Sequence, residues 1–215
     1  MPQSFKVHSS SVVDEGAIIG KGTSIWHFSH ICSSAVIGEN CSLGQNVLVA
    51  DNATLGNNVK VQNNVAIYGG VTIEDDVFLG PSCVLTNVTN PRSQVSRKTL
   101  YEKTHIKKGA TIGANATIVC GITLGRYCFI GAGTVVTRDV PDYGLILGNP
   151  GQLAGFMSRH GHRLSFEDND LAFCPESNYQ YKKVGETIHC LDLDEDELLP
   201  DNLSVGTKYY TSFKK

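Results

Sequence analysis

The stretch LTNVTNPRSQVSRKTLYEKTH (85–105) gathers side chains that could bind an anion. Together with the three residues that follow, it carries six Arg or Lys side chains against a single acid, Glu102. Carboxylates and diphosphates are natural partners of such a cluster, because the planar guanidinium of Arg can donate two parallel hydrogen bonds to them. We therefore interpret this stretch as an anion-binding loop, and an ordinary solvated loop is the alternative.

Three histidines are candidates for a general base. His27 and His30 lie within IWHFSHI (25–31), and His105 closes the basic stretch. An imidazole within hydrogen-bond reach of a substrate could accept its proton near neutral pH. None of the three stands in a catalytic motif, and a single His on a strand is more often structural. The sequence leaves open whether any of them acts as a base.

The basic stretch 85–105 interrupts a six-residue repeat that runs through most of the chain. An Ile, Leu or Val recurs at every sixth position from 7 to 85, and again from 106 to 136. Three residues after most of these positions comes Gly, Asn or Asp, and four residues after them comes a small or β-branched side chain. Six corners lack Gly, Asn or Asp: Ser10, Phe28, Ser34, Ser82, Val88 and Tyr127.

A period of six fits neither an α-helix nor a plain strand, but it fits a short strand followed by a corner. Gly, Asn and Asp tolerate the positive φ that such a corner needs. Three strands and three corners close a triangular coil of about 18 residues, and stacked coils pair as parallel strands. We predict an all-β fold, a triangular prism of about seven coils. A β-sandwich, the alternative, would not keep the six-residue step.

The predicted prism occupies residues 1–164, with an inserted loop at 91–105. A loop inserted at a corner preserves the phase of the coils, so that Ile106 begins the third face of the interrupted coil. Residues one coil apart then stack, which places Asn87 above Gly69, and Asn63 two coils above His27. Bare backbone at Gly69 would let a ligand approach. We expect a small appendage at 165–190, and an acidic tail at 191–215 that is flexible or packed on a partner.

The composition excludes several classes of function. The chain has 215 residues and a net charge of −3, and the acidic excess lies in LDLDEDELLP (191–200). A neutral body with an acidic end gives no support to nucleic-acid binding. No apolar run is long enough to cross a bilayer, no signal-peptide core follows Met1, and seven Cys give no paired framework. We therefore expect a protein of the reducing cytoplasm.

The repeat resembles that of a known family. Hexads such as IGENCS, LGNNVK and IGANAT, and the segment IGAGTVVTRDVPDYGLILGNPGQLAG (130–155), are similar to the hexapeptide-repeat acyltransferases. The resemblance runs from residue 7 to about residue 164. It implies a left-handed parallel β-helix, although the pattern alone does not fix the handedness. It also implies acetyl-CoA as co-substrate, with coenzyme A bound partly by residues 130–155.

A closer resemblance indicates the acceptor. IWHFSHI, VKVQNNVAIY, VFLGPSCVLTNVTNPRS and GHRL (161–164) together resemble the UDP-2-acetamido-3-amino-2,3-dideoxyglucuronate N-acetyltransferases of bacterial surface-polysaccharide pathways. The resemblance implies acetylation of the C3 amine to give a 2,3-diacetamido sugar for lipopolysaccharide. It also implies direct attack by that amine, whose pKa should be roughly 8, and a homotrimer with sites at subunit interfaces. A dTDP-3-amino-3,6-dideoxyhexose is the alternative acceptor.

The same resemblance implies roles for individual residues. Asn87 matches the TN of the pattern TNxxNPR and is expected to hold or orient the sugar as the catalytic residue. Arg92 is expected to bind the sugar carboxylate or the diphosphate. The other expected sugar-nucleotide contacts are His27, Lys60, Asn63, Asn64 and Tyr68. The expected coenzyme A contacts are Gly113, Gly131, Ala132, Arg138, Asn149, Pro150 and Arg159.

The sequence predicts no metal site. FCPESNYQYKKVGETIHC (173–190) resembles a Cys-knuckle of some relatives, but it retains only Cys174 and Cys190, with His189 beside the latter. Zinc in a structural site needs four ligands. The γ-class carbonic anhydrases use the same prism with zinc-binding His residues five apart, whereas His27 and His30 are three apart. A non-catalytic scaffold is a further alternative, against which the coenzyme A-type segment argues.

Overall fold

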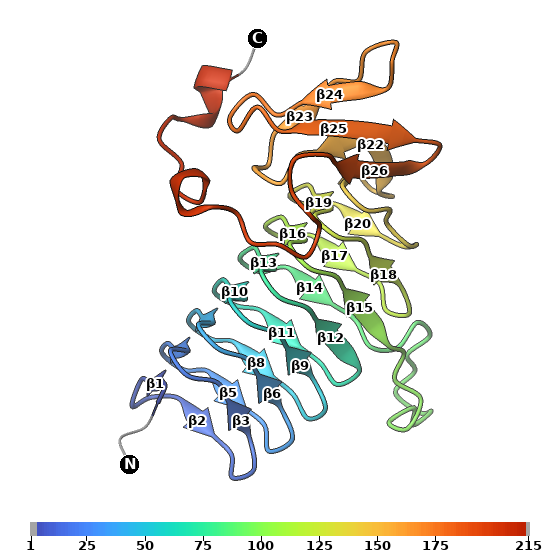
Figure 1. Cartoon of the computed structure of the whole chain (residues 1–215). Coiled ribbons are helices and arrows are strands. Elements are labelled where there is room, and N and C mark those ends of the chain that lie inside the picture. The colour runs from blue at the N-terminus through green and yellow to red at the C-terminus, as the bar shows by residue number, and fades with distance from the viewer. Residues whose placement is uncertain (1–3, 214–215) are drawn as a thin grey trace.

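The computed structural model describes residues 4–213 as a stack of short parallel strands that forms a triangular prism (Figure 1). The prediction of an all-β parallel β-helix is confirmed, and the stack is consistent with the left-handed form. Within the described residues, helical structure is limited to two 3-10 turns, η1 (Asp201–Leu203) and η2 (Tyr210–Phe213). No described helix has the length and apolar character needed to span a membrane.

Each face of the prism is one parallel sheet. We call the faces A, B and C, in the order in which the chain visits them, and the corners between them the AB, BC and CA edges. Face A contains β1 (Lys6–Val7), β4 (Ser24–Ile25), β7 (Ser42–Leu43), β10 (Lys60–Val61), β13 (Phe78–Leu79), β16 (Thr111–Ile112), β19 (Phe129–Ile130) and β21 (Gly144–Leu147).

The other two faces are shorter. Face B contains β2 (Val12–Val13), β5 (His30–Ile31), β8 (Leu48–Val49), β11 (Ala66–Ile67), β14 (Val84–Leu85), β17 (Thr117–Ile118) and β20 (Val135–Val136). Face C contains β3 (Ile18–Ile19), β6 (Val36–Ile37), β9 (Thr54–Leu55), β12 (Val71–Ile73), β15 (Thr104–Ile106) and β18 (Thr123–Leu124). The predicted coils are present, and β21 adds one more parallel strand to face A.

The core is a set of identical positions stacked along the prism axis. Ile31, Val49, Ile67 and Leu85 follow one another up face B, and each is at most 1% exposed. From the second coil on, the small residue after most corners also points inward and is buried, as predicted for Cys41, Val65 and others. Each fully buried aliphatic side chain contributes roughly 1.5–3 kcal/mol, so stacking coil on coil supplies most of the stability.

Most corners have the positive φ that the sequence predicts, although Ser10 and Ser34 do not. Asn40, Asn46, Asn52, Asn58 and Asn64 all have φ between 55° and 62°. These side chains tolerate the left-handed region better than other non-glycine residues do. The same conformation occurs at three corners that lack Gly, Asn and Asp, namely Phe28, Ser82 and Tyr127. The stacking of the coils therefore imposes the corner even where the residue type disfavours it.

One corner is replaced by a long excursion on the BC edge. The chain leaves face B after β14 and rejoins face C at β15, and this loop projects from the side of the prism (Figure 1). Ile106 pairs with Ile73, so the coil phase is preserved as predicted. The bounds differ from the predicted 91–105. The excursion covers residues 86–103, because Thr104 and His105 already pair with β12.

The chain beyond the prism packs back onto it. β22 (Gln152–Met157) and β23 (Arg163–Leu164) extend face A antiparallel, and β24 (Leu171–Phe173), β25 (Gln180–Val184) and β26 (Thr187–Cys190) form a separate antiparallel sheet. The acidic segment then crosses the CA edge, where Tyr127 donates a 2.7 Å hydrogen bond to the carbonyl of Glu195. The described part of the tail thus contacts its own chain. The division into three domains remains a proposal.

Candidate active site

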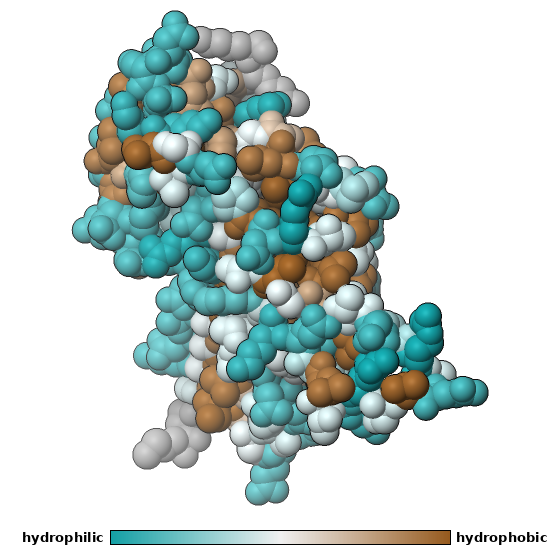
Figure 2. Space-filling view, turned by 90° about the vertical axis from the view of Figure 1, so that its right-hand side faces the viewer, coloured by the Kyte–Doolittle hydropathy of each residue, from teal (hydrophilic) through white to brown (hydrophobic). Residues whose placement is uncertain are grey.

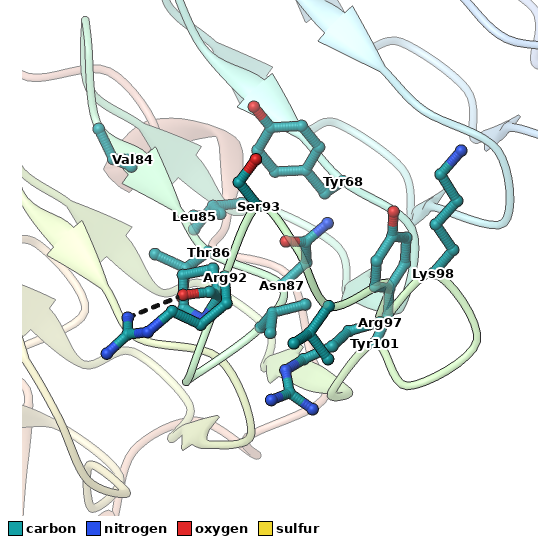
Figure 3. Close-up of a pocket in the computed structure, with 13 residues that line it drawn as sticks. Tyr68, Val84, Leu85, Thr86, Asn87, Arg92, Ser93, Arg97, Lys98 and Tyr101 are labelled. Atoms are coloured by element: carbon teal, nitrogen blue, oxygen red, sulfur yellow. Dashed lines mark hydrogen bonds between the residues drawn. The ribbon is translucent and has the colours of Figure 1, made fainter.

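A cavity of about 650 Å³ lies on the BC edge, between the prism wall and the inserted loop (Figure 3). Strand β14 and the residues after it form one wall, and the loop forms the other. Three of the predicted site residues line this cavity: Tyr68 from the preceding coil, and Asn87 and Arg92 from the excursion. The remaining lining residues are Val84, Leu85, Thr86, Val88, Pro91, Ser93, Val95, Arg97, Lys98 and Tyr101.

Asn87 is held by the backbone at the root of the loop. The amide N–H of Glu102 donates a 3.0 Å hydrogen bond to the carbonyl of Asn87, which closes the neck of the excursion. The side-chain amide of Asn87 lies between the Tyr68 and Tyr101 side chains (Figure 3). An amide offers both a hydrogen-bond donor and an acceptor, so this position can orient a polar ligand group inside the cavity.

Gly69, one coil from Asn87, has a packing role of its own. A Cβ at this position would lie 2.6 Å from the carbonyl oxygen of Asp51, so any side chain would clash with the neighbouring coil. The same Cβ would lie 3.9 Å from the ring of Tyr101. The packing against Asp51 therefore explains why glycine is needed here. The ring of Tyr101, from the loop, lies over the backbone that we expected to be open to a ligand.

Glu102 fastens the loop. Its carboxylate accepts hydrogen bonds from the Thr89 hydroxyl at 2.5 Å and from the Thr89 backbone N–H at 3.0 Å. These hydrogen bonds from Thr89 hold the pKa of Glu102 below its usual value, because they favour the ionised form. The single acid of the basic stretch is thus a structural anchor, and it leaves the positive charges of the loop without an acidic partner inside it.

The basic residues of the stretch divide between two places. Arg97 and Arg92 line the cavity, yet their guanidinium groups donate to loop carbonyls, to Asn90 and Pro91 respectively, each at 3.0 Å. Both groups point away from the Asn87 amide (Figure 3). Lys108 lies beyond β15 on the CA edge, where it donates to the carbonyl of Asp196. The interpretation of residues 85–108 as one anion site is therefore wrong for Lys108, because strand β15 lies between Lys108 and the loop.

Two of the other predicted sugar-nucleotide residues lie on the opposite edge of face B. His27 and Asn63 line a smaller cavity of about 310 Å³ on the AB edge, beside Trp26. The His27 ring stacks on that of His8 at 3.5 Å between centroids. Asn63 accepts a 2.8 Å hydrogen bond from the backbone N–H of Gln45, one coil below. The AB edge thus offers aromatic and amide groups, whereas the BC edge offers Asn87 and the loop.

Two further predicted contacts stand apart from both cavities. Asn64 lines a hollow of about 220 Å³ on face B with Phe28 and His30, and accepts a 3.1 Å hydrogen bond from Asn46. Lys60 lies on face A, where its ammonium donates to the carbonyl of Asn40 at 2.9 Å. Within one chain, the structure does not bring the six predicted sugar-nucleotide residues together.

The predicted coenzyme A residues also occupy different edges. Gly113, Gly131 and Ala132 lie on the AB edge, and a Cβ at Gly113 would be 2.5 Å from the backbone nitrogen of Ala132. Arg138 lies on the BC edge beside a hollow of about 340 Å³ and donates to Gln152 at 2.5 Å. The last three are found beyond the final coil: Asn149 and Pro150 in the turn between β21 and β22, and Arg159 after β22.

Arg159 is engaged by the acidic tail. Its guanidinium donates to the carbonyls of Asp194 at 2.9 Å and Glu197 at 2.5 Å, and lies 4.6 Å from the ring centroid of Tyr127. A role in binding the phosphates of coenzyme A stays a prediction, and it would require this guanidinium to exchange the tail carbonyls for phosphate oxygens.

The candidate bases lie outside the large cavity. His30 pairs with Asp14 at 3.0 Å and His105 pairs with Glu74 at 2.7 Å, while His27 lies on the AB edge. Among residues 4–213, no histidine lines the cavity at Asn87. The sequence reasoning missed Tyr101, which faces Tyr68 across the Asn87 amide (Figure 3). The sequence marks Tyr101 only as an aromatic residue inside the excursion, because the six-residue repeat does not predict where loop residues lie.

Comparison with known proteins identifies the family. The family model for bacterial transferase hexapeptide (six repeats) matches residues 7–51, 52–87 and 103–138, which leaves out most of the inserted loop. The chain therefore belongs to the bacterial transferases with hexapeptide repeats.

One curated relative is similar over most of its length. The dTDP-3-amino-3,6-dideoxy-alpha-D-galactopyranose 3-N-acetyltransferase of Aneurinibacillus thermoaerophilus is 45% identical over 175 residues, covering 81% of this chain and 90% of that protein. The bifunctional protein GlmU of Thermosynechococcus vestitus is 31% identical over 129 residues, 60% of this chain but only 26% of that protein. A solved structure of a mutant GDP-perosamine N-acetyl transferase from Caulobacter crescentus is 21% identical, with a TM-score of 0.47, covering 69% of this chain and 55% of that chain.

The anchoring role of Glu102 predicts a local effect on the loop. Replacing Glu102 by Ala removes the acceptor for both Thr89 hydrogen bonds, so amide hydrogen exchange within residues 88–101 should become at least several-fold faster. Exchange in the prism strands should not change. Glu39→Ala, which removes an exposed acid from the CA edge, is the matched control and should leave the loop unaffected. An unchanged loop in Glu102→Ala would show that other contacts hold it.

Proposed function

We propose that this protein transfers the acetyl group of acetyl-CoA to the amino group of a nucleotide-linked amino sugar. The observation that carries the proposal is the 45% identity to a nucleotide-sugar 3-N-acetyltransferase over 81% of this chain. The cavity at Asn87 supports it, since it combines an amide, two phenols and a basic loop on a rigid edge. Such a site can hold a sugar hydroxyl or amine and a phosphate at the same time.

The reaction requires little from the protein beyond positioning the acceptor amine at the thioester carbonyl. The acceptor amine should have a pKa of roughly 8, so a useful fraction is neutral near pH 7 without a protein base. It attacks the thioester carbonyl, the C–S bond breaks, and coenzyme A leaves as a thiolate that takes up the proton released by the amine. Asn87 would orient the sugar for this attack, and orientation alone can supply several kcal/mol of the barrier reduction.

For the acceptor we favour a dTDP-3-amino-3,6-dideoxyhexose, the sugar class in the name of the relative. UDP-2-acetamido-3-amino-2,3-dideoxyglucuronate, a lipopolysaccharide precursor, is the second candidate. Its carboxylate would need a cation facing the sugar, and the Arg92 and Arg97 guanidinium groups instead bond to loop carbonyls and point away from Asn87 (Figure 3). A deoxyhexose has no such requirement.

We also propose that the site is completed between copies of the chain in a homotrimer, in the bacterial cytoplasm. The predicted residues lie on two opposite edges of face B, with Asn87 on the BC edge and Asn63 on the AB edge. The outward side chains of face B carry no Lys, Arg, Asp or Glu, and they are Val12, His30, Leu48, Ala66, Val84, Thr117 and Val135. Val12 and Val84 are about half exposed.

Packing this face against other copies would cover its valines and bring one chain's AB edge to the next chain's BC edge. The side of the molecule shown in Figure 2, which is the right-hand side of Figure 1, mixes apolar and polar groups. The coenzyme A residues on the AB edge, such as Gly131, would then lie near the neighbouring copy's loop.

The acceptor assignment is tested by a panel of UDP- and dTDP-linked 3- and 4-amino sugars, with and without a C6 carboxylate. Release of free coenzyme A thiol from acetyl-CoA measures turnover. We expect the highest kcat/KM with a dTDP-3-amino-3,6-dideoxyhexose. Preference for the glucuronate would make it the acceptor, and no turnover with any amino sugar would overturn the proposed function.

Substituting Asn87 tests its role directly. Asn87→Ala removes the amide that would orient the sugar, so kcat should fall by about 100-fold, as expected for a misplaced reacting group. The melting temperature should change little, because the side chain lies at the cavity surface. Asn90→Ala, at an exposed loop position outside the cavity lining, is the matched control and should keep wild-type kinetics. Wild-type kinetics in Asn87→Ala would remove Asn87 from the site.

A further inference from the structure

Three side chains of metal-ligating types meet at the N-terminal end of the BC edge. Asp14 follows strand β2, His30 is the first residue of β5, and Cys32 follows β5 directly. Their ligand atoms all lie within 4.8 Å of one another, and the Asp14 carboxylate is 3.0 Å from His30 Nε2. The backbone fixes this arrangement, because β2 and β5 pair in register and the N–H of Asp14 donates to the carbonyl of Ile31 at 2.9 Å.

The donor set suits a borderline-soft divalent cation. Thiolate, imidazole and carboxylate are the three ligand types found in zinc sites, and a site with three protein ligands keeps a fourth position for water. In a single chain without a metal, the side chains of the Asp14–His30 pair are 40% and 48% exposed, and exposed pairs of this kind contribute little to stability.

Carboxylates near Cys32 favour a cation at this cluster. Asp14 offers a ligand atom within 4.8 Å of the Cys32 thiol. Asp51, on the next coil, accepts hydrogen bonds from the hydroxyl groups of Ser33 and Ser34. Binding of a divalent cation would release the thiol proton to solvent and leave a metal-bound thiolate.

The position of the cluster suggests what the metal would do. Within the described residues 4–213, the first coil stacks on a neighbouring coil on one side only, and its aliphatic residues Val7, Val13 and Ile19 are partly buried. The equivalent residue of the next coil, Ile31, is fully buried. The ends of repeat stacks lack the contacts that stabilise the middle. Asp14 belongs to the first coil, whereas His30 and Cys32 belong to the second.

We propose that Asp14, His30 and Cys32 bind a zinc-class divalent cation that fastens the first coil of the prism to the second. The metal takes no part in the proposed acetyl transfer, since Asp14 and Cys32 stand three coils or more from Asn87 along the BC edge. The stabilisation it supplies grows with the concentration of free metal relative to its dissociation constant, and it acts only on the folded chain.

The test is a Co²⁺ titration of the full-length protein after treatment with a chelator. We expect one Co²⁺ per chain, with a thiolate-to-cobalt charge-transfer band in the near ultraviolet. Cys32→Ser should abolish the band, and His30→Gln should weaken binding at least ten-fold. His105→Gln removes a second exposed His–carboxylate pair, His105 with Glu74, and is the matched control that keeps the band.

Stability provides a second readout. Zn²⁺ should raise the melting temperature of the chelator-treated wild type and slow amide exchange in residues 6–19, and it should do neither in Cys32→Ser. Equal melting temperatures of the two proteins in chelator would show that the substitution leaves the metal-free fold intact. Absence of the band in the wild type, or an undiminished band in Cys32→Ser, would overturn the proposal. Neither result bears on acetyl transfer.

Discussion

Most corners of this prism adopt positive φ, and the aliphatic residues of each coil stack on those of the coils above and below. The two features support one another, because the corner sets the direction of the next strand and the stacked core holds the corner. The conformation persists at Phe28 and Tyr127, whose side chains disfavour it. This mutual constraint makes the edges rigid, so a side chain on an edge has a fixed position relative to every other edge.

The candidate site exploits that rigidity at a single interruption. The excursion on the BC edge adds a loop without disturbing the register, since Ile106 still pairs with Ile73. Asn87 remains on the rigid edge, while the loop's Tyr101 covers it and Glu102 closes the neck. A regular scaffold thus supplies the fixed group, and the inserted loop supplies the adaptable wall and its positive charge.

Much of the fold could be predicted because each six-residue step carries its own evidence for strand, corner and inward position. The site could be predicted only in part. Asn87 and Tyr68 stand on the repeat, so their edge followed from counting, but Tyr101 stands on a loop whose path no period describes. Lys108 was misplaced for a related reason. It follows the loop closely in sequence, but strand β15 takes the chain across face C, so Lys108 lies on the CA edge. The contacts of Arg159 with the acidic tail depend on the path of residues 165–197, which the repeat does not reach.

The central claim is that two opposite edges of face B, on different copies of the chain, form one site. Co-expression of Asn87→Ala with Asn63→Ala tests it, since each variant spoils a different edge. If the sites lie between copies in a trimer, random mixing leaves about a quarter of the sites with both edges intact, so about a quarter of wild-type activity should return. A mixture no more active than the two variants measured separately would contradict the account.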